Sequence, residues 1–181
     1  MRLFVAAELP AEMLEALSET SAALRSTVRG RYVAPDRFHV TLAFLGEVPG
    51  SLVADVISAV EQGCEGHASM CASLGALGSF GRARSATLWQ SINTGDSLPA
   101  LARDVRESLR VKGFSMDEKS FLAHVTLMRA ADLSQAVLPM PVVEKGTIDT
   151  VTVFKSDLSG PHPVYTPLER ILLEDVEPVS F

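Results

Sequence analysis

The chain has little cysteine, no surplus of positive charge and no long apolar run. Cys64 and Cys71 are the two cysteines in 181 residues, so no disulfide framework is expected and a reducing cytoplasm is the expected location. Its net charge of −6 argues against binding nucleic acid through general excess charge, although a local basic pocket stays open. No segment approaches the ~18–20 apolar residues that cross a bilayer, and Glu8 and Pro10 interrupt the opening apolar run, which excludes a signal peptide and predicts no membrane partner.

Familiar catalytic signatures are also missing. The sequence contains no Walker loop, no Gly-x-Gly-x-x-Gly and no evident serine or cysteine nucleophile elbow. Cys64, His67 and Cys71 match no standard zinc spacing and lack a fourth ligand, so we expect no metal and no organic cofactor. Low-complexity segments and Pro/Ser-rich linkers are absent as well, and 47% of the residues are hydrophobic. We therefore expect one compact domain over residues 1–181, acting as a monomer.

Strand-like and helix-like segments alternate along the chain. Amphipathic spacing predicts helices that begin near Pro10, Leu52 and Leu98. Gly30, Gly63 and Gly113 mark their ends. The expected strands are 3–7, 38–45, 69–77, 86–92, 121–128, 147–154 and 164–173, and the Gly- and Ser-rich stretch 78–85 is expected to be a loop. This order predicts an α+β fold.

One four-residue pattern, His-Val-Thr-Leu, occurs twice. It begins at His39 and again at His124, about half the chain apart, each time within a predicted strand that follows a predicted strand and helix. Two copies are too few for a solenoid, which needs at least three. We infer an internal duplication: two interleaved lobes, each a small antiparallel sheet with helices outside, facing a central cleft.

The repeated pattern places chemistry on one face of each strand. Successive strand side chains alternate, so His39 and Thr41 share a face, as do His124 and Thr126. Imidazole can accept and donate protons near neutral pH. One histidine can deprotonate water while the other protonates a departing oxygen, and threonine hydroxyls can bind phosphoryl oxygens. The pair therefore suits in-line displacement at phosphorus. We expect a bell-shaped dependence of kcat/KM on pH, with both limbs near neutrality.

At these residues the sequence resembles the 2H phosphoesterase superfamily, and most closely its RNA 2′,3′-cyclic phosphodiesterase family, also called 2′-5′ RNA ligase-like. The resemblance extends over nearly the whole chain. The segments that carry it are Arg2-Leu-Phe-Val-Ala, Phe38-His-Val-Thr-Leu-Ala-Phe-Leu-Gly46, Leu88-Trp89, Ala123-His-Val-Thr-Leu-Met-Arg129 and Ser159-Gly-Pro-His-Pro-Val-Tyr165.

The resemblance implies a bilobal fold with a pseudo-two-fold axis. It also implies metal-independent hydrolysis of RNA or nucleoside 2′,3′-cyclic phosphates to 2′-phosphomonoesters, with reverse 2′-5′ ligation as a possible second reaction. It implies that His39 is the proton donor and His124 the proton acceptor. Thr41, Thr126 and Arg129 are expected to bind the phosphate. Strict alternation would place Arg129 on the face opposite His124, so it reaches the cleft only if the strand ends or bulges near Met128.

Two other functions stay open at this point. The first is a 2H enzyme acting on another phosphoester, such as a cyclic ADP-ribose phosphate. The second is a binding module that holds an RNA terminal phosphate without cleaving it. Several residues have both a functional and a structural interpretation: Arg82 and Arg84 as contacts to a nucleic-acid backbone, His162 at a cleft rim, and Phe44, Trp89 and Tyr165 as base-stacking side chains.

Overall fold

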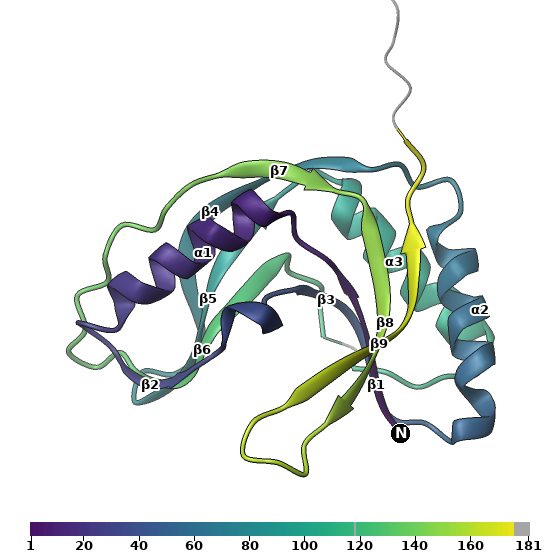
Figure 1. Ribbon diagram of the computed structural model, residues 1–181, viewed down its shortest axis with the longest axis horizontal. Coiled ribbons are helices and arrows are strands. Elements are labelled where there is room, and N and C mark those ends of the chain that lie inside the picture. The colour runs from purple at the N-terminus through teal and green to yellow at the C-terminus, as the bar shows by residue number, and fades with distance from the viewer. Residues whose placement is uncertain (118, 176–181) are drawn as a thin grey trace, which may run out of the picture.

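Two antiparallel sheets form the protein, which is described by a computed structural model over residues 1–117 and 119–175 (Figure 1). The helices are α1 (Ala11–Leu24), α2 (Val53–Cys64) and α3 (Ser97–Val111), with short 3-10 turns at Pro35–Arg37 and Gly50–Leu52. The strands are β1 (Arg2–Ala7), β2 (Arg29–Tyr32), β3 (Val40–Glu47), β4 (Met70–Arg82), β5 (Ser85–Asn93), β6 (His124–Asp132), β7 (Lys145–Ile148), β8 (Thr150–Asp157) and β9 (Val164–Leu172). The predicted α+β class with two small antiparallel sheets is confirmed.

The smaller sheet has the strand order β3-β1-β8-β9 and the larger one β2-β6-β5-β4-β7. β1 lies between two partners, and five of its six residues are buried, which explains its unbroken apolar sequence. The two strands that carry the repeated pattern, β3 and β6, belong to different sheets. Each pairs with the first strand of its own half of the sequence, β3 with β1 and β6 with β5.

The helices connect the two halves of the chain. α1 follows β1 of the smaller sheet but packs against β7 of the larger one, and α3 follows β5 of the larger sheet but packs against β3 of the smaller one. Figure 1 shows α2 and α3 side by side, apart from α1. β2, from the N-terminal half, forms the edge of the larger sheet beside β6. Each sheet is therefore covered by a helix from the other half.

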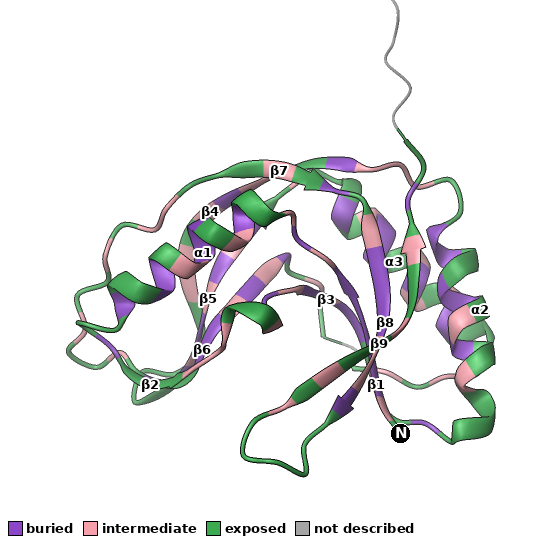
Figure 2. Cartoon of the chain, in the orientation of Figure 1, coloured by how far each residue is buried: buried purple, intermediate pink, exposed green. Residues whose placement is uncertain are grey.

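The apolar spacing of α3 correctly identifies its buried face. Leu98, Leu101, Ala102, Val105 and Leu109 are all buried, and Figure 2 shows the burial alternating along the helix. Gly63 lets α2 approach this face closely. A Cβ at that position would lie 2.6 Å from the Cα of Val105, so any larger residue would push the two helices apart.

Three expectations about local structure are wrong, and one strand was not expected. The stretch 78–85 is not a loop: β4 continues to Arg82, because Gly78 lets the Trp89 ring of β5 lie directly against it, 2.2 Å from where a Cβ would stand. The segment 29–32 forms strand β2. Segment 147–154 is two strands in different sheets. The first helix ends before Val28.

Within the described residues, no helix is long and apolar enough to cross a membrane.

Candidate active site

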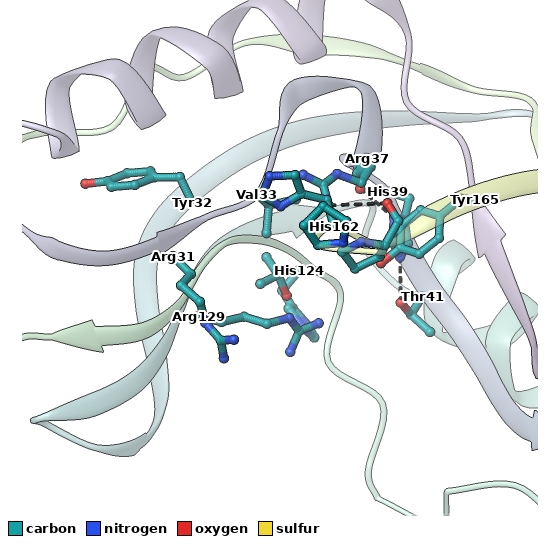
Figure 3. A pocket seen from close by; sticks show the side chains of 13 residues that line it. Arg31, Tyr32, Val33, Arg37, His39, Thr41, His124, Arg129, His162 and Tyr165 are labelled. Atoms are coloured by element: carbon teal, nitrogen blue, oxygen red, sulfur yellow. Dashed lines mark hydrogen bonds between the residues drawn. The ribbon is translucent and has the colours of Figure 1, made fainter. Parts of the chain in front are cut away.

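His39 comes just before β3 and is held by two hydrogen bonds. Its Nδ1–H donates to the carbonyl oxygen of Arg37 at 2.7 Å, and the Thr41 hydroxyl donates to its Nε2 at 3.1 Å (Figure 3). The first bond selects the tautomer in which Nε2 is the basic nitrogen. The rings of Phe4 and Tyr165 lie 5.0 Å and 5.6 Å from the imidazole, centroid to centroid, and remove much of its contact with water.

His124 is positioned in the same way at the start of β6. Its Nδ1–H donates to the carbonyl oxygen of Leu122 at 2.7 Å, again two residues back along the chain, which leaves Nε2 free. Phe80 and Trp89 flank this ring at centroid distances of 5.2 Å and 5.7 Å. Both histidines therefore have a fixed tautomer and direct a basic nitrogen away from the backbone bond.

A bulge follows the threonine in both strands. In β6, Thr126 pairs with Trp89 and Met128 pairs with Leu88, so Leu127 is an extra residue. In β3 the register moves in the same way around Leu42. Each bulge buries two successive residues and shifts the alternation by one. As a result, the side chain three residues after each threonine lies on the same face of the strand as the threonine, whereas without a bulge it would be the side chain two residues after it.

The two bulges bring different side chains to that third position. It is Arg129 in β6 and Phe44 in β3, and both are exposed. A second irregularity follows Arg129, where Ala130 has a φ of 51°. The bulge explains how Arg129 reaches the cleft although strict alternation points it away, and it places the buried Met128 on the opposite side.

The two histidine motifs line one cavity. Its walls include His39, Thr41, His124, Thr126 and Arg129. Tyr165, Pro163 and His162, from the β8–β9 connection and β9, close one end, and Arg37 donates from its guanidinium to the carbonyl oxygen of Pro163 at 3.4 Å. His162 thus lies at the rim of the cavity.

The environment of His39 disfavours its charged form. The pKa of His39 is lowered to about 4, mainly by burial; the bond to the Arg37 carbonyl opposes this shift, and the charges of Arg129 and His124 add to it. His39 is consequently neutral in the free protein at pH 7. The sequence-based expectation that both titrations lie near neutrality is therefore wrong for this histidine.

A second hollow adjoins the first and shares Thr41, His124, Thr126 and Arg129 with it. Its remaining wall includes aromatic rings and basic side chains beside the carboxylate of Asp117; Phe44, Phe80, Phe121, Arg106 and Lys119 are among its residues. Arg2 stacks its guanidinium over the Phe44 ring at 4.8 Å. Exposed aromatic rings beside a phosphate site are typical of proteins that stack nucleobases.

The other sequence candidates lie elsewhere or have structural contacts. Trp89 packs against Gly78 and lies beside the rings of Phe80 and His124, while Tyr165 lines the first hollow. Arg82 and Arg84 are exposed near the β4–β5 turn and line neither hollow.

The cysteine and histidine cluster is divided among different contacts. Cys64 is buried, which raises the pKa of its thiol to about 12, while His67 binds the Asp104 carboxylate through Nε2 at 2.9 Å. Cys71 is exposed. Among the described residues, no three His, Cys, Asp or Glu side chains are arranged to hold a metal ion.

Sequence reasoning missed the cavity residues that come from β2 and from the turn after it. Arg31 and Tyr32 lie on β2, and Val33 and Arg37 follow it. The Arg-Gly-Arg-Tyr sequence has neither the alternation nor the apolar content of a typical strand. Only its pairing with β6, which includes a bond from the Val33 amide to the Leu127 carbonyl at 2.9 Å, makes it a strand.

Residues 13–153 match the sequence profile of the 2′-5′ RNA ligase superfamily, and the chain belongs to this family. An RNA 2′,3′-cyclic phosphodiesterase of Thermus thermophilus is 29% identical, with 96% of this chain and 90% of that protein covered. A Geobacillus stearothermophilus protein of the same name is 34% identical over 70% of this chain but only 41% of its own length. The crystal structure of E. coli LigT complexed with 3′-AMP superimposes with a TM-score of 0.78 and 28% identity, covering 95% of this chain and 97% of that one.

Proposed function

We propose that this chain hydrolyses the 2′,3′-cyclic phosphate of RNA termini or nucleosides to a 2′-phosphomonoester. The observation that carries the proposal is the cavity in which two imidazoles of defined tautomer, two threonine hydroxyls and Arg129 meet. Relatives that span most of the chain are named for this activity, and a similar structure holds a nucleotide. Its substrates are RNA ends or cyclic nucleotides.

In the proposed reaction, water attacks phosphorus opposite the 3′ oxygen. Nε2 of His124 takes a proton from this water as the new P–O bond forms. The P–O3′ bond breaks, and His39 Nε2–H protonates the leaving 3′ oxygen. The hydroxyls of Thr41 and Thr126 and the guanidinium of Arg129 hold the charged phosphoryl oxygens. Opening the strained five-membered ring lowers the barrier, and the phosphate stays on the 2′ oxygen.

His39 must be protonated when the substrate is bound, although it is neutral in the free protein. The bound phosphodiester supplies a negative charge beside the imidazole and offsets the positive charge of Arg129. Both changes raise the pKa of His39 toward the range in which it can donate a proton. Substrate binding thus favours the protonated form of His39, which is the form that donates the proton. No step needs a metal, because each proton and each negative charge has a protein group to receive it.

Residues 1–181 act as one unit in this proposal, because each sheet supplies one histidine and one threonine to the cavity. We further propose that the protein works as a monomer in the cytoplasm. One chain supplies both histidines and both threonines of the cavity, so the reaction needs no second copy. The free thiols of Cys64 and Cys71 suit a reducing compartment.

A direct assay tests the proposal. The protein is incubated with adenosine 2′,3′-cyclic phosphate in excess chelator, and the products are separated from a 3′-AMP standard. We expect repeated turnover to 2′-AMP. Saturable binding without turnover would instead identify a module that only holds RNA ends, and 3′-AMP as the product would contradict the assigned leaving oxygen.

A further inference from the structure

Two arginines face one another across the edge of the larger sheet. Arg31 of β2 is the direct register partner of Arg129 of β6. Like charges placed opposite each other on neighbouring strands destabilise a sheet. Both side chains line the cavity that holds the two histidines, and Figure 3 shows them together on one side of it. The charge pair is therefore unfavourable unless an anion lies between or beside the two guanidiniums.

No acidic group neutralises this pair within the part of the chain that the structure describes. Neither guanidinium forms a salt bridge or a hydrogen bond there with residues 1–117 or 119–175. Asp132, the nearest carboxylate along β6, is instead the register partner of Arg29. The arrangement leaves two permanently charged, bidentate donors directed at a cavity.

The backbone holds the two arginines in this position. Gly30 lies against the second irregularity of β6: a Cβ there would be 2.6 Å from the Met128 Sδ and 2.9 Å from the Ala130 carbonyl oxygen. Only glycine allows β2 to approach so closely. The shift in register at Gly30 places Arg29 opposite Asp132 and Arg31 opposite Arg129. The two arginines of one short strand thus have opposite environments.

We propose that Arg31 binds a second phosphate of the substrate, the one on the 5′ oxygen of the terminal nucleoside. This assignment rests on the proposed function. Arg129 shares the face of Thr126 and serves the cyclic phosphate, whereas Arg31 lies one strand further out, at about 5 Å spacing. A second phosphate joined through the ribose reaches this outer position. The site therefore prefers a 5′-phosphorylated nucleotide or an RNA chain over a nucleoside cyclic phosphate.

The test compares two substrates that differ by one phosphate: adenosine 2′,3′-cyclic phosphate with and without a 5′-phosphate. We expect kcat/KM of the wild type to be at least about tenfold higher with the 5′-phosphate, as a charge-assisted contact gives. Arg31→Ala should abolish this preference, so that kcat/KM becomes about equal for the two substrates. Arg29→Ala, which removes the same charge from the same strand, should keep the preference.

Other results would overturn the assignment. An equal loss on both substrates places Arg31 at the cyclic phosphate, and no loss on either shows that it does not contact the substrate. If the wild type cleaves neither substrate, the proposed function itself fails. Anion binding by the arginine pair is then tested separately, by measuring unfolding temperatures with inorganic pyrophosphate. Pyrophosphate should raise the unfolding temperature of the wild type and of Arg29→Ala more than that of Arg31→Ala.

A structural role is distinguished by the unfolding temperature without any anion. We expect Arg31→Ala to unfold at the same temperature as the wild type or higher, because the substitution removes a repulsion. A lower unfolding temperature than that of Arg29→Ala would show that Arg31 supports the fold, and would count against its assignment to a ligand.

Discussion

The two copies of His-Val-Thr-Leu have the same backbone and different surroundings. Both histidines donate Nδ1–H to a carbonyl two residues back, at 2.7 Å, and both strands bulge after the threonine. The first imidazole is packed between Phe4 and Tyr165, while the second borders an open aromatic hollow. The same local sequence thus produces the same backbone geometry, and neighbouring residues from other strands determine the surroundings of each imidazole.

The largest effect should come from removing either imidazole. We expect His39→Ala and His124→Ala each to lower kcat by at least ~10²-fold, since general acid and base catalysis contribute this much. The double variant should lose little more than either single one, because the two groups act in the same step. His67→Ala, which removes a histidine bonded to Asp104 outside the cavity, is the control. Near-normal turnover by either cavity variant would remove that histidine from the mechanism.

The second effect is the pH dependence of stability that the buried His39 produces. An unfolded histidine titrates near 6.5, whereas burial lowers the pKa of His39 to about 4 in the folded protein. The unfolded state therefore binds more protons between these values, and stability falls as the pH decreases from 6.5 to 4. The loss reaches up to about 3 kcal/mol from this group.

Urea unfolding at pH 7 and at pH 4.5 measures this contribution. We expect His39→Gln to lose less stability over the interval than the wild type does. An NMR titration of the His39 ring should show a midpoint near pH 4. A midpoint close to 6.5, with the same acid sensitivity in both proteins, would show that burial does not distinguish the first copy from a solvated histidine.

A smaller effect tests the residue three positions after each threonine. Arg129→Ala should lower kcat/KM by about tenfold or more and lower kcat as well, because a contact to the phosphoryl charge strengthens in the transition state. Phe44→Ala should raise KM by about fivefold with little change in kcat, as loss of base stacking would. Steady-state kinetics on adenosine 2′,3′-cyclic phosphate separates the two. If Arg129→Ala and Phe44→Ala lowered kcat equally, the assignment of Arg129 to the phosphate and of Phe44 to the nucleoside would be wrong.

The smallest effect expected is that of chelation. A catalytic zinc usually takes three protein ligands, and the residues on the two histidine faces are Thr41, Thr126, Phe44 and Arg129. The rate should stay within about twofold after exhaustive dialysis against chelator, a change too small to reflect loss of a catalytic metal. Activity that disappears and then returns with one specific metal would mean that the two copies do not act as a proton-transfer pair.

Much of the fold follows from local pattern. The buried face of α3 and the apolar run of β1 were predicted because burial enforces a period of 3.6 residues on the one and continuous hydrophobicity on the other. β2 could not be predicted, since its polar residues are ordered by β6, about a hundred residues away. The extension of β4 through 78–82 was hidden for a related reason: its glycines suggest a loop, while Gly78 actually gives room to Trp89.

The sequence by itself determined the pair of histidines, the pair of threonines and their shared faces, because alternation along a strand is a local property. Tertiary structure decided which third side chain joins each pair, since bulges at Leu42 and Leu127 depend on pairing with β1 and β5. It also decided the charge of His39, through rings from β1 and β9. The pairing of β2 with β6, which places Arg31 opposite Arg129, was likewise decided by tertiary structure. Which side chains share a strand face depends on residues that are neighbours in the sequence, whereas desolvation and charge pairing depend on residues that only the folded chain brings together.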